Sequence, residues 1–382
     1  MNTYEANNIN DLTPSEGLEF QINDDGSGYI VVGSGSCRDK DIVIPSTYSG
    51  LPVTEIGEGA FRPIGMSGIT SIYIPDSVKV IGKHAFENCE SLVEINIPSG
   101  ITVINDYTFL RCDRLSKITL PDTVTEIGAC AFDDCDSLTE ITLNSGLKTI
   151  NWGAFECCKN LRKIDIPEGV EIIDYYLFDL CTRLKEISIP KSVKDINPLA
   201  FNDCLSLERI TVHEDNEHYK SIDGNLYTKD GSTLVHYASG KNDESFYVPS
   251  DVTTIDEFAF EYSKKLKTIS IPDSVKEIKR GAFYHCEALE SIHIPDGVTK
   301  IAHDTFSHCN ALECITIPKS VTRIEAYSMQ ASMIIFEDPT NWQTAKGGLF
   351  SGISKSLLSD PAKASKAFST GKYSKVAIKK KT

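Results

Sequence analysis

The sequence has no apolar run long enough to cross a membrane. A membrane helix needs about 18 consecutive apolar residues, and polar or charged residues interrupt every apolar stretch of this chain sooner. The segment 1–8 (MNTYEANN) has neither the basic region nor the apolar core of a signal peptide. Membrane insertion is therefore not expected. Because no signal peptide is visible, a cytoplasmic location is not excluded.

Positive charge is also scarce. The chain has 38 Lys and Arg residues against 54 Asp and Glu residues, which gives a net charge of −16 at pH 7. Proteins that bind nucleic acid carry a basic patch or stripe, so nucleic acid is excluded as a partner. The segment 355–382 departs from this balance with eight lysines and one aspartate, a composition typical of a solvated terminus.

Motifs for catalysis and metal binding are missing. The eight histidines are scattered, and none lies in a nucleophile motif. His213, Glu214, Asp215, Glu217 and His218 lie close together in the chain, but without EF-hand or H-E-x-x-H spacing. The sequence therefore predicts a protein that is not an enzyme and has no cofactor or metal site.

The chain does contain a repeat of 23 residues. Phenylalanine recurs with this spacing at positions 86, 109, 132, 155, 178 and 201, and again at 260, 283 and 306. Most of these phenylalanines are followed by a cysteine, a leucine and then I-x-I-P, as in Ile95-Asn96-Ile97-Pro98. A fixed period of this kind indicates a solenoid, in which a coil buries its apolar face only by stacking on its neighbours.

Each repeat carries one clear strand pattern. In the repeat around Ile95, Ile95 and Ile97 are expected to point inward and Glu94 and Asn96 outward. Ten of the sixteen prolines stand at the end of such a segment, where a missing backbone donor is tolerated. Thirteen segments of this type predict a long parallel sheet. A second apolar pair follows the strand, as in Val124 and Ile127.

Eight cysteines occupy one position of the repeat. Free cysteine behaves as a small apolar residue, whereas a zinc site needs closely spaced pairs. A buried core position is therefore expected, rather than disulfides or zinc ligands, for Cys89, Cys112, Cys135, Cys158, Cys181, Cys204, Cys286 and Cys309.

The repeat resembles that of the BspA-like leucine-rich repeat family. The unit "AFENCESLVEINIPSGITVI" follows the family pattern A-F-x-x-C-x-x-L-x-x-I-x-I-P-x-x-V-x-x-I, and residues 42–329 continue it. The resemblance implies a right-handed leucine-rich-repeat solenoid. It also implies a bacterial cell-surface or secreted protein that takes part in adhesion or host contact.

Five segments are expected along the chain. Residues 1–40 form an N-terminal tail and a β-hairpin cap, with strands on either side of 23–28. Residues 41–212 and 246–336 form two blocks of leucine-rich repeats, separated by a β-hairpin insertion at 213–245 with an Asp-Gly turn. Residues 337–382 form a C-terminal cap and basic tail, in which Asp360-Pro361 starts a short helix that covers the last coil together with Trp342 and Phe350.

Two surfaces are candidates for binding a partner. The first is the insertion, where tyrosines and a histidine lie among acidic residues; the alternative is that they pack against the interrupted coil. The second is the outward face of the strands. One column of this face alternates in charge from strand to strand, and we call it the charge ladder: Glu94, Lys117, Glu140, Lys163, Glu186 and Arg209. The neighbouring column is mostly small and polar, as at Thr119 and Thr142. The residues selected are Tyr219, Tyr227, His236 and Tyr237 in the insertion, and Tyr73, Lys163, Glu186, Arg209 and His293 on the strands.

The sequence thus predicts a non-enzymatic interaction or adhesion module with a protein or glycan partner, acting as a monomer. An intracellular repeat scaffold, or the repeat support of a larger multidomain protein, are the alternatives. Twelve cysteines and the absence of a visible signal peptide favour the intracellular alternative.

Overall fold

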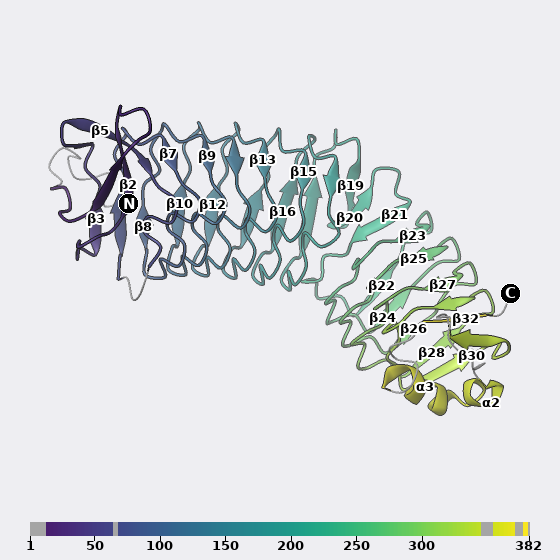
Figure 1. The fold of residues 1–382 in the computed structure, drawn as a ribbon. Coiled ribbons are helices and arrows are strands. Elements are labelled where there is room, and N and C mark those ends of the chain that lie inside the picture. The colour runs from purple at the N-terminus through teal and green to yellow at the C-terminus, as the bar shows by residue number, and fades with distance from the viewer. Residues whose placement is uncertain (1–12, 64–67, 345–353, 371–376, 381–382) are drawn as a thin grey trace. The chain divides into compact units, whose positions relative to one another are not determined.

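Each repeat forms two short strands joined by turns, and equivalent strands of successive coils pair in parallel (Figure 1). The computed structural model describes residues 13–63, 68–344, 354–370 and 377–380. It divides into a first unit, 1–201, and a second unit, 202–382. The insertion at 213–245 lies within the second unit.

The first strand column comes from the I-x-I-P segments and contains the thirteen strands that the sequence predicts, counted over the described residues. In the first unit these strands are β3 (Asp41–Val43), β6 (Ser71–Tyr73), β8 (Glu94–Ile95), β10 (Lys117–Thr119), β12 (Glu140–Thr142), β14 (Lys163–Asp165) and β16 (Glu186–Ile189). In the second unit they are β18 (Arg209–Val212), β22 (Ser245–Tyr247), β24 (Thr268–Ser270), β26 (Ser291–Ile292), β28 (Cys314–Ile317) and β30 (Met333–Phe336). Short strands make few bonds each, and the column is divided into several hydrogen-bonded sheets.

A second strand column follows the V-x-x-I segments. In the first unit it comprises β5 (Leu51–Ile56), β7 (Val80–Ile81), β9 (Val103–Ile104), β11 (Glu126–Ile127), β13 (Thr149–Ile150), β15 (Ile172–Ile173) and β17 (Asp195–Ile196). In the second unit it comprises β23 (Thr254–Ile255), β25 (Glu277–Ile278), β27 (Lys300–Ile301) and β29 (Arg323–Ile324). Sequence analysis found the apolar pair but not the strands, because two residues are too few to show alternation.

The Ala-Phe turn forms the third side of each coil. The backbone N–H groups of Tyr107, Phe109 and Arg111 donate to carbonyls of the next coil over 2.8–2.9 Å. Tyr107 and Arg111 have φ angles of 58° and 57°, which non-glycine residues seldom adopt. The residues two before and two after the phenylalanine take this conformation in most coils. The hydrogen bonds between coils offset its cost.

A phenylalanine ladder and a cysteine ladder fill the core. The Phe109, Phe132 and Phe155 rings stack with centroid distances of 5.3 and 5.6 Å. The cysteine Sγ atoms donate to the phenylalanine carbonyl of the preceding coil, at 3.3 Å from Cys135 to Phe109 and 3.2 Å from Cys158 to Phe132. All eight column cysteines are buried and outside any disulfide, which confirms the expected core position.

The ends of the solenoid are covered as the sequence predicts. In the first unit, β1 (Glu19–Ile22) and β2 (Tyr29–Gly33) form the antiparallel hairpin, and β2 pairs with β5. In the second unit, α2 (Lys355–Leu358) precedes α3 (Pro361–Ser369), whose N-cap is Asp360. The Phe368 ring of α3 lies 5.8 Å from Phe336 of β30, and Trp342 is buried beside it. Phe350 lies outside the described residues.

The last strands of the second unit complete this cap. β31 (Trp342–Thr344) and β32 (Ile378–Lys380) pair in antiparallel fashion, and β32 also pairs with β29. In the first unit, the short strand β4 (Thr47–Tyr48) pairs with β5.

The insertion replaces part of a coil. Its strands β19 (Tyr219–Ile222), β20 (Asn225–Thr228) and β21 (Thr233–His236) are antiparallel, and β21 then pairs in parallel with β23. Tyr237 follows β21 and stacks on Phe260 at 5.4 Å. Tyr237 therefore takes the place of a phenylalanine, one repeat before Phe260.

Candidate functional site

The insertion tyrosines are core residues, which corrects the expectation that they form an exposed edge. The exposed fractions of Tyr219, Tyr227, His236 and Tyr237 are 9%, 1%, 4% and 1%. Tyr227 and Tyr237 belong to the apolar core of the second unit. Burial also lowers the pKa of His236 to about 4 and so favours the neutral imidazole. The alternative that these side chains pack against the interrupted coil fits their burial.

The charge ladder lies on the outward face of the first strand column. Lys163 and Glu186 are register partners on β14 and β16, and both are exposed. The Lys117 Nζ atom lies 3.4 Å from the Glu140 carboxylate, whereas Lys163 pairs along its own strand with Asp165 at 3.2 Å. Exposed pairs of this kind contribute about 1 kcal/mol or less. In the second unit, Arg209 is likewise exposed on β18.

The outward face of the second unit contains a shallow hollow of about 470 Å³ across β22, β24, β26 and β28. Tyr247 stands at its edge with 76% of its surface exposed. His293, which the sequence analysis selected, lines the hollow together with Ser270 and Thr316. Tyr73, at the equivalent strand position of the first unit, is half-buried. Tyr247 stands one period before Ser270, in the same column as Tyr73 and His293. Sequence analysis missed it because the insertion interrupts the repeat directly before this strand.

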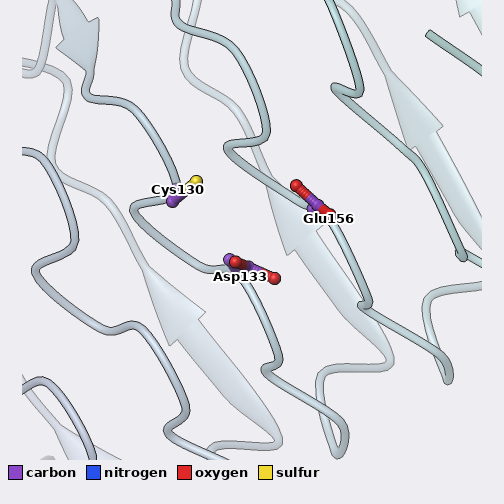
Figure 2. A group of neighbouring side chains, drawn as sticks. All are labelled: Cys130, Asp133 and Glu156. Atoms are coloured by element: carbon purple, nitrogen blue, oxygen red, sulfur yellow. The ribbon is translucent and has the colours of Figure 1, made fainter. Parts of the chain in front are cut away.

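A second group of polar side chains lies on the turn side of the first unit. Figure 2 shows Cys130 and Asp133 on one turn and Glu156 on the next. One ligand-type atom from each residue lies within 4.8 Å of the others, and Asp134 and Cys157 extend the group around Asp133. Cys130 is buried, and the other four are half-buried.

Burial and crowding of like charges disfavour ionisation in this group. Burial, with a smaller contribution from Asp134, raises the pKa of Asp133 to about 6. Burial and the neighbouring Asp133 raise the pKa of Glu156 to about 7. The pKa of the Cys130 thiol rises to about 12, again through burial first and the nearby carboxylates second. A cation at this place would stabilise the ionised carboxylates.

With the geometry established, the relationship to known proteins can be stated. Residues 36–129, 102–229 and 236–354 match the model for the BspA type leucine rich repeat region. The chain belongs to the BspA-type leucine-rich repeat family. No curated protein matches the chain.

Several solved structures share the fold of this BspA-type protein. A leucine rich cell surface protein from Faecalibacterium prausnitzii is 29% identical over 84% of this chain and 86% of its own, with a TM-score of 0.62. A leucine-rich repeat protein from Bacteroides ovatus is 28% identical over 85% and 88%, with a TM-score of 0.63. One from Eubacterium ventriosum is 25% identical over 81% and 76%, with a TM-score of 0.54.

The solved relatives and the family model give information about the cellular location and the catalytic activity of such proteins. The Faecalibacterium relative is a cell-surface protein, and BspA-type repeats are typically non-catalytic. None of the helices in the described part of the chain is long and apolar enough to cross a bilayer. This BspA-type protein is thus a bacterial leucine-rich repeat protein of cell-surface type.

Proposed function

We propose that this protein is a non-catalytic binding module at the bacterial cell surface, and that it binds a protein or glycan partner as a monomer. The contact is made by the hollow on the outward face of β22, β24, β26 and β28. The exposure of Tyr247 at its edge is the observation that carries this assignment.

The chemistry of the hollow supports the proposal. A tyrosine with 76% of its surface in water is unusual for a residue that can bury a large ring. Tyrosine supplies contact area at low cost in side-chain entropy and can also hydrogen-bond. The neighbouring Ser270, Ser291 and Thr316 offer hydroxyl groups. Such a surface fits the hydroxyls of a sugar or the polar backbone of an extended peptide.

The last strand of the same sheet, β30, adds apolar contact area next to the hollow. Met333 and Ile335 of β30 are 44% and 37% exposed. Cys314 and Thr316 of β28, which line the hollow, are the register partners of these two residues. The exposed face therefore runs from an aromatic edge across a polar floor to an apolar strand.

The test is a binding screen of the purified chain against arrays of glycans and of immobilised extracellular-matrix proteins. For any ligand found, Tyr247→Ala should weaken binding about tenfold, as truncation of an interface tyrosine commonly does. Tyr327→Ala is the control, because Tyr327 is a 46% exposed tyrosine of the same unit outside the hollow. Binding that survives both Tyr247→Ala and His293→Ala would contradict the proposed site. Antibody labelling of intact against permeabilised cells tests the location.

A further inference from the structure

Four aromatic side chains lie on the turn side of the first unit, on the turn that carries Glu156 and on neighbouring turns. The Tyr107 and Trp152 rings meet edge to face at 6.4 Å, and the Tyr175 and Tyr176 rings lie 3.8 Å apart. Trp152 and Tyr175 are 42% and 40% exposed. We call this the aromatic–acidic surface, made of Tyr107, Trp152, Tyr175, Tyr176, Asp133 and Glu156.

The backbone of successive turns brings these groups together. The Cys130 N–H donates to the Trp152 carbonyl at 3.1 Å, and the Gly153 N–H donates to the Tyr175 carbonyl at 3.0 Å. Gly153 has a φ of 63°, and a Cβ at this place would lie 3.0 Å from both Cys130 Sγ and Glu156 Oε2. The glycine thus leaves room for the Glu156 carboxylate and the Cys130 thiol beside the turn that carries Trp152.

Positive charge balances the carboxylates of this surface only weakly, since Arg111 makes a minor contribution that lowers the pKa of Asp133 and no cation from the described part of the chain acts in this way on Glu156. Among the described residues, neither Asp133 nor Glu156 forms an ion pair with a lysine or arginine. The two nearby cations are engaged elsewhere: Arg111 and Lys159 each lie 3.6 Å from the Asp134 carboxylate. An incoming positive group would therefore meet two carboxylates that have no direct ion-pair partner among the described residues, beside exposed aromatic rings.

We propose that the aromatic–acidic surface binds an arginine side chain in a basic segment of a partner protein. A guanidinium stacks on aromatic faces through its planar surface and donates paired hydrogen bonds to carboxylates. A lysine ammonium matches the charge but not the planar stacking. The aromatic–acidic surface belongs to the first unit and the hollow to the second, so the two proposals rest on different residues.

A metal ion fits the same place less well. Cys130, Asp133 and Glu156 supply one thiol and two carboxylates, but a thiol must lose its proton to bind a metal. Burial among carboxylates opposes that loss at Cys130. A metal would also leave Trp152 and Tyr175, the most exposed groups of the surface, without a role.

The test measures fluorescence anisotropy of a labelled Gly-Ser peptide with three spaced arginines, added to the full chain. Matched peptides carry lysine, or the neutral arginine isostere citrulline. The arginine peptide should bind most tightly and the citrulline peptide should not bind. Trp152→Ala and Glu156→Gln should each weaken binding about fivefold or more, whereas Trp152→Phe should retain most of it.

Three controls separate this site from general attraction to an acidic protein. Glu140→Gln removes an exposed carboxylate from the strand face of the same unit and should leave binding unchanged. Tyr247→Ala tests the hollow and should also have no effect. The proposal is overturned if citrulline binds as well as arginine, or if Glu140→Gln weakens binding as much as Glu156→Gln. It is likewise overturned if ZnCl2 alone raises the melting temperature in a Cys130-dependent way while the peptide does not bind.

Discussion

Ser263 interrupts the cysteine ladder, and replacing it with cysteine should stabilise the second unit. Ser263 lies three residues after Phe260, at the cysteine position of the repeat, and is 1% exposed. Among the described residues its hydroxyl has no hydrogen-bond partner. In the next coils, Cys286 and Cys309 donate to the preceding phenylalanine carbonyl over 3.1 and 3.2 Å. The C–O bond of serine is too short to reach the equivalent carbonyl, that of Tyr237.

The size of the effect follows from this difference. A buried polar group without a partner costs about 1–3 kcal/mol, and the thiol of Ser263→Cys fills the same space with a larger, less polar atom. We therefore expect a gain of about 1–3 kcal/mol. For a unit of this size, 1 kcal/mol shifts the melting temperature by about 2–4 °C. Cys286→Ser makes the reverse change and should destabilise by a similar amount.

The assay needs a signal from the second unit alone, because repeat arrays need not unfold in one step. Trp342 lies in this unit and is buried, so its fluorescence in a Trp152→Phe background reports on its unfolding. Ser263→Ala separates removal of the hydroxyl from addition of the thiol and should stabilise less than cysteine. Ser291→Cys, at an exposed serine, should change nothing. If Ser263→Cys and Cys286→Ser both leave the melting temperature unchanged, the argument from the thiol ladder is wrong.

Two further predictions concern the first unit. Phe155→Ala should cost about 3–5 kcal/mol in urea unfolding, because Phe155 stacks between Phe132 and Phe178 at 5.6 and 5.9 Å. Phe61→Ala should cost less, since among the described residues Phe61 stacks on one ring only, that of Phe86. Equal small losses at both positions would refute a continuous ladder. Asp133 and Glu156 have raised pKa values of about 6 and 7, so the folded state binds more protons than the unfolded state between about pH 4 and 7. Their contribution to the free energy of unfolding therefore falls as pH rises through this window. The double variant Asp133→Asn with Glu156→Gln should reduce this loss of stability by roughly 1 kcal/mol after allowance for solvent screening. A pH profile of melting temperatures that the double variant leaves unchanged would contradict the raised pKa values.

Much of the fold follows from the sequence, because burial repeats with the coil. Phenylalanine and cysteine stand at fixed positions, and each repeat places them in the same column. The N-terminal hairpin and helix α3 also follow from local signals, the latter from the Asp360 cap before Pro361. Tyr237 is the instructive error. It stands one period before Phe260, but its type and its acidic neighbours suggested a surface residue.

The candidate sites are harder to predict, because they depend on positions the repeat leaves variable. His285 and His308 share one such column, one period apart, and their rings stack at 4.1 Å. Trp152 and Tyr175 stand one period apart at the same place in the repeat, and Glu156 follows Trp152 by four residues on the same turn. Their proximity depends on which way each turn residue points. Without the φ angles of the turns, the period alone does not show that they meet.

The turn conformation itself explains why varied chemistry gathers on this side. A positive φ favours glycine, and Gly153 holds this position in one turn, yet neighbouring turns place Tyr107, Cys130 and Tyr176 there, with φ values of 58°, 49° and 55°. Each non-glycine residue there costs roughly 1 kcal/mol or more in backbone energy. The ladder of hydrogen bonds between coils holds this backbone whatever the side chain, so the position tolerates large aromatic and acidic groups. On the strand face, by contrast, pairing across coils selects small polar residues such as Thr119, Thr142 and Ser188. The turn side is therefore where this solenoid has room for side chains of varied size and charge.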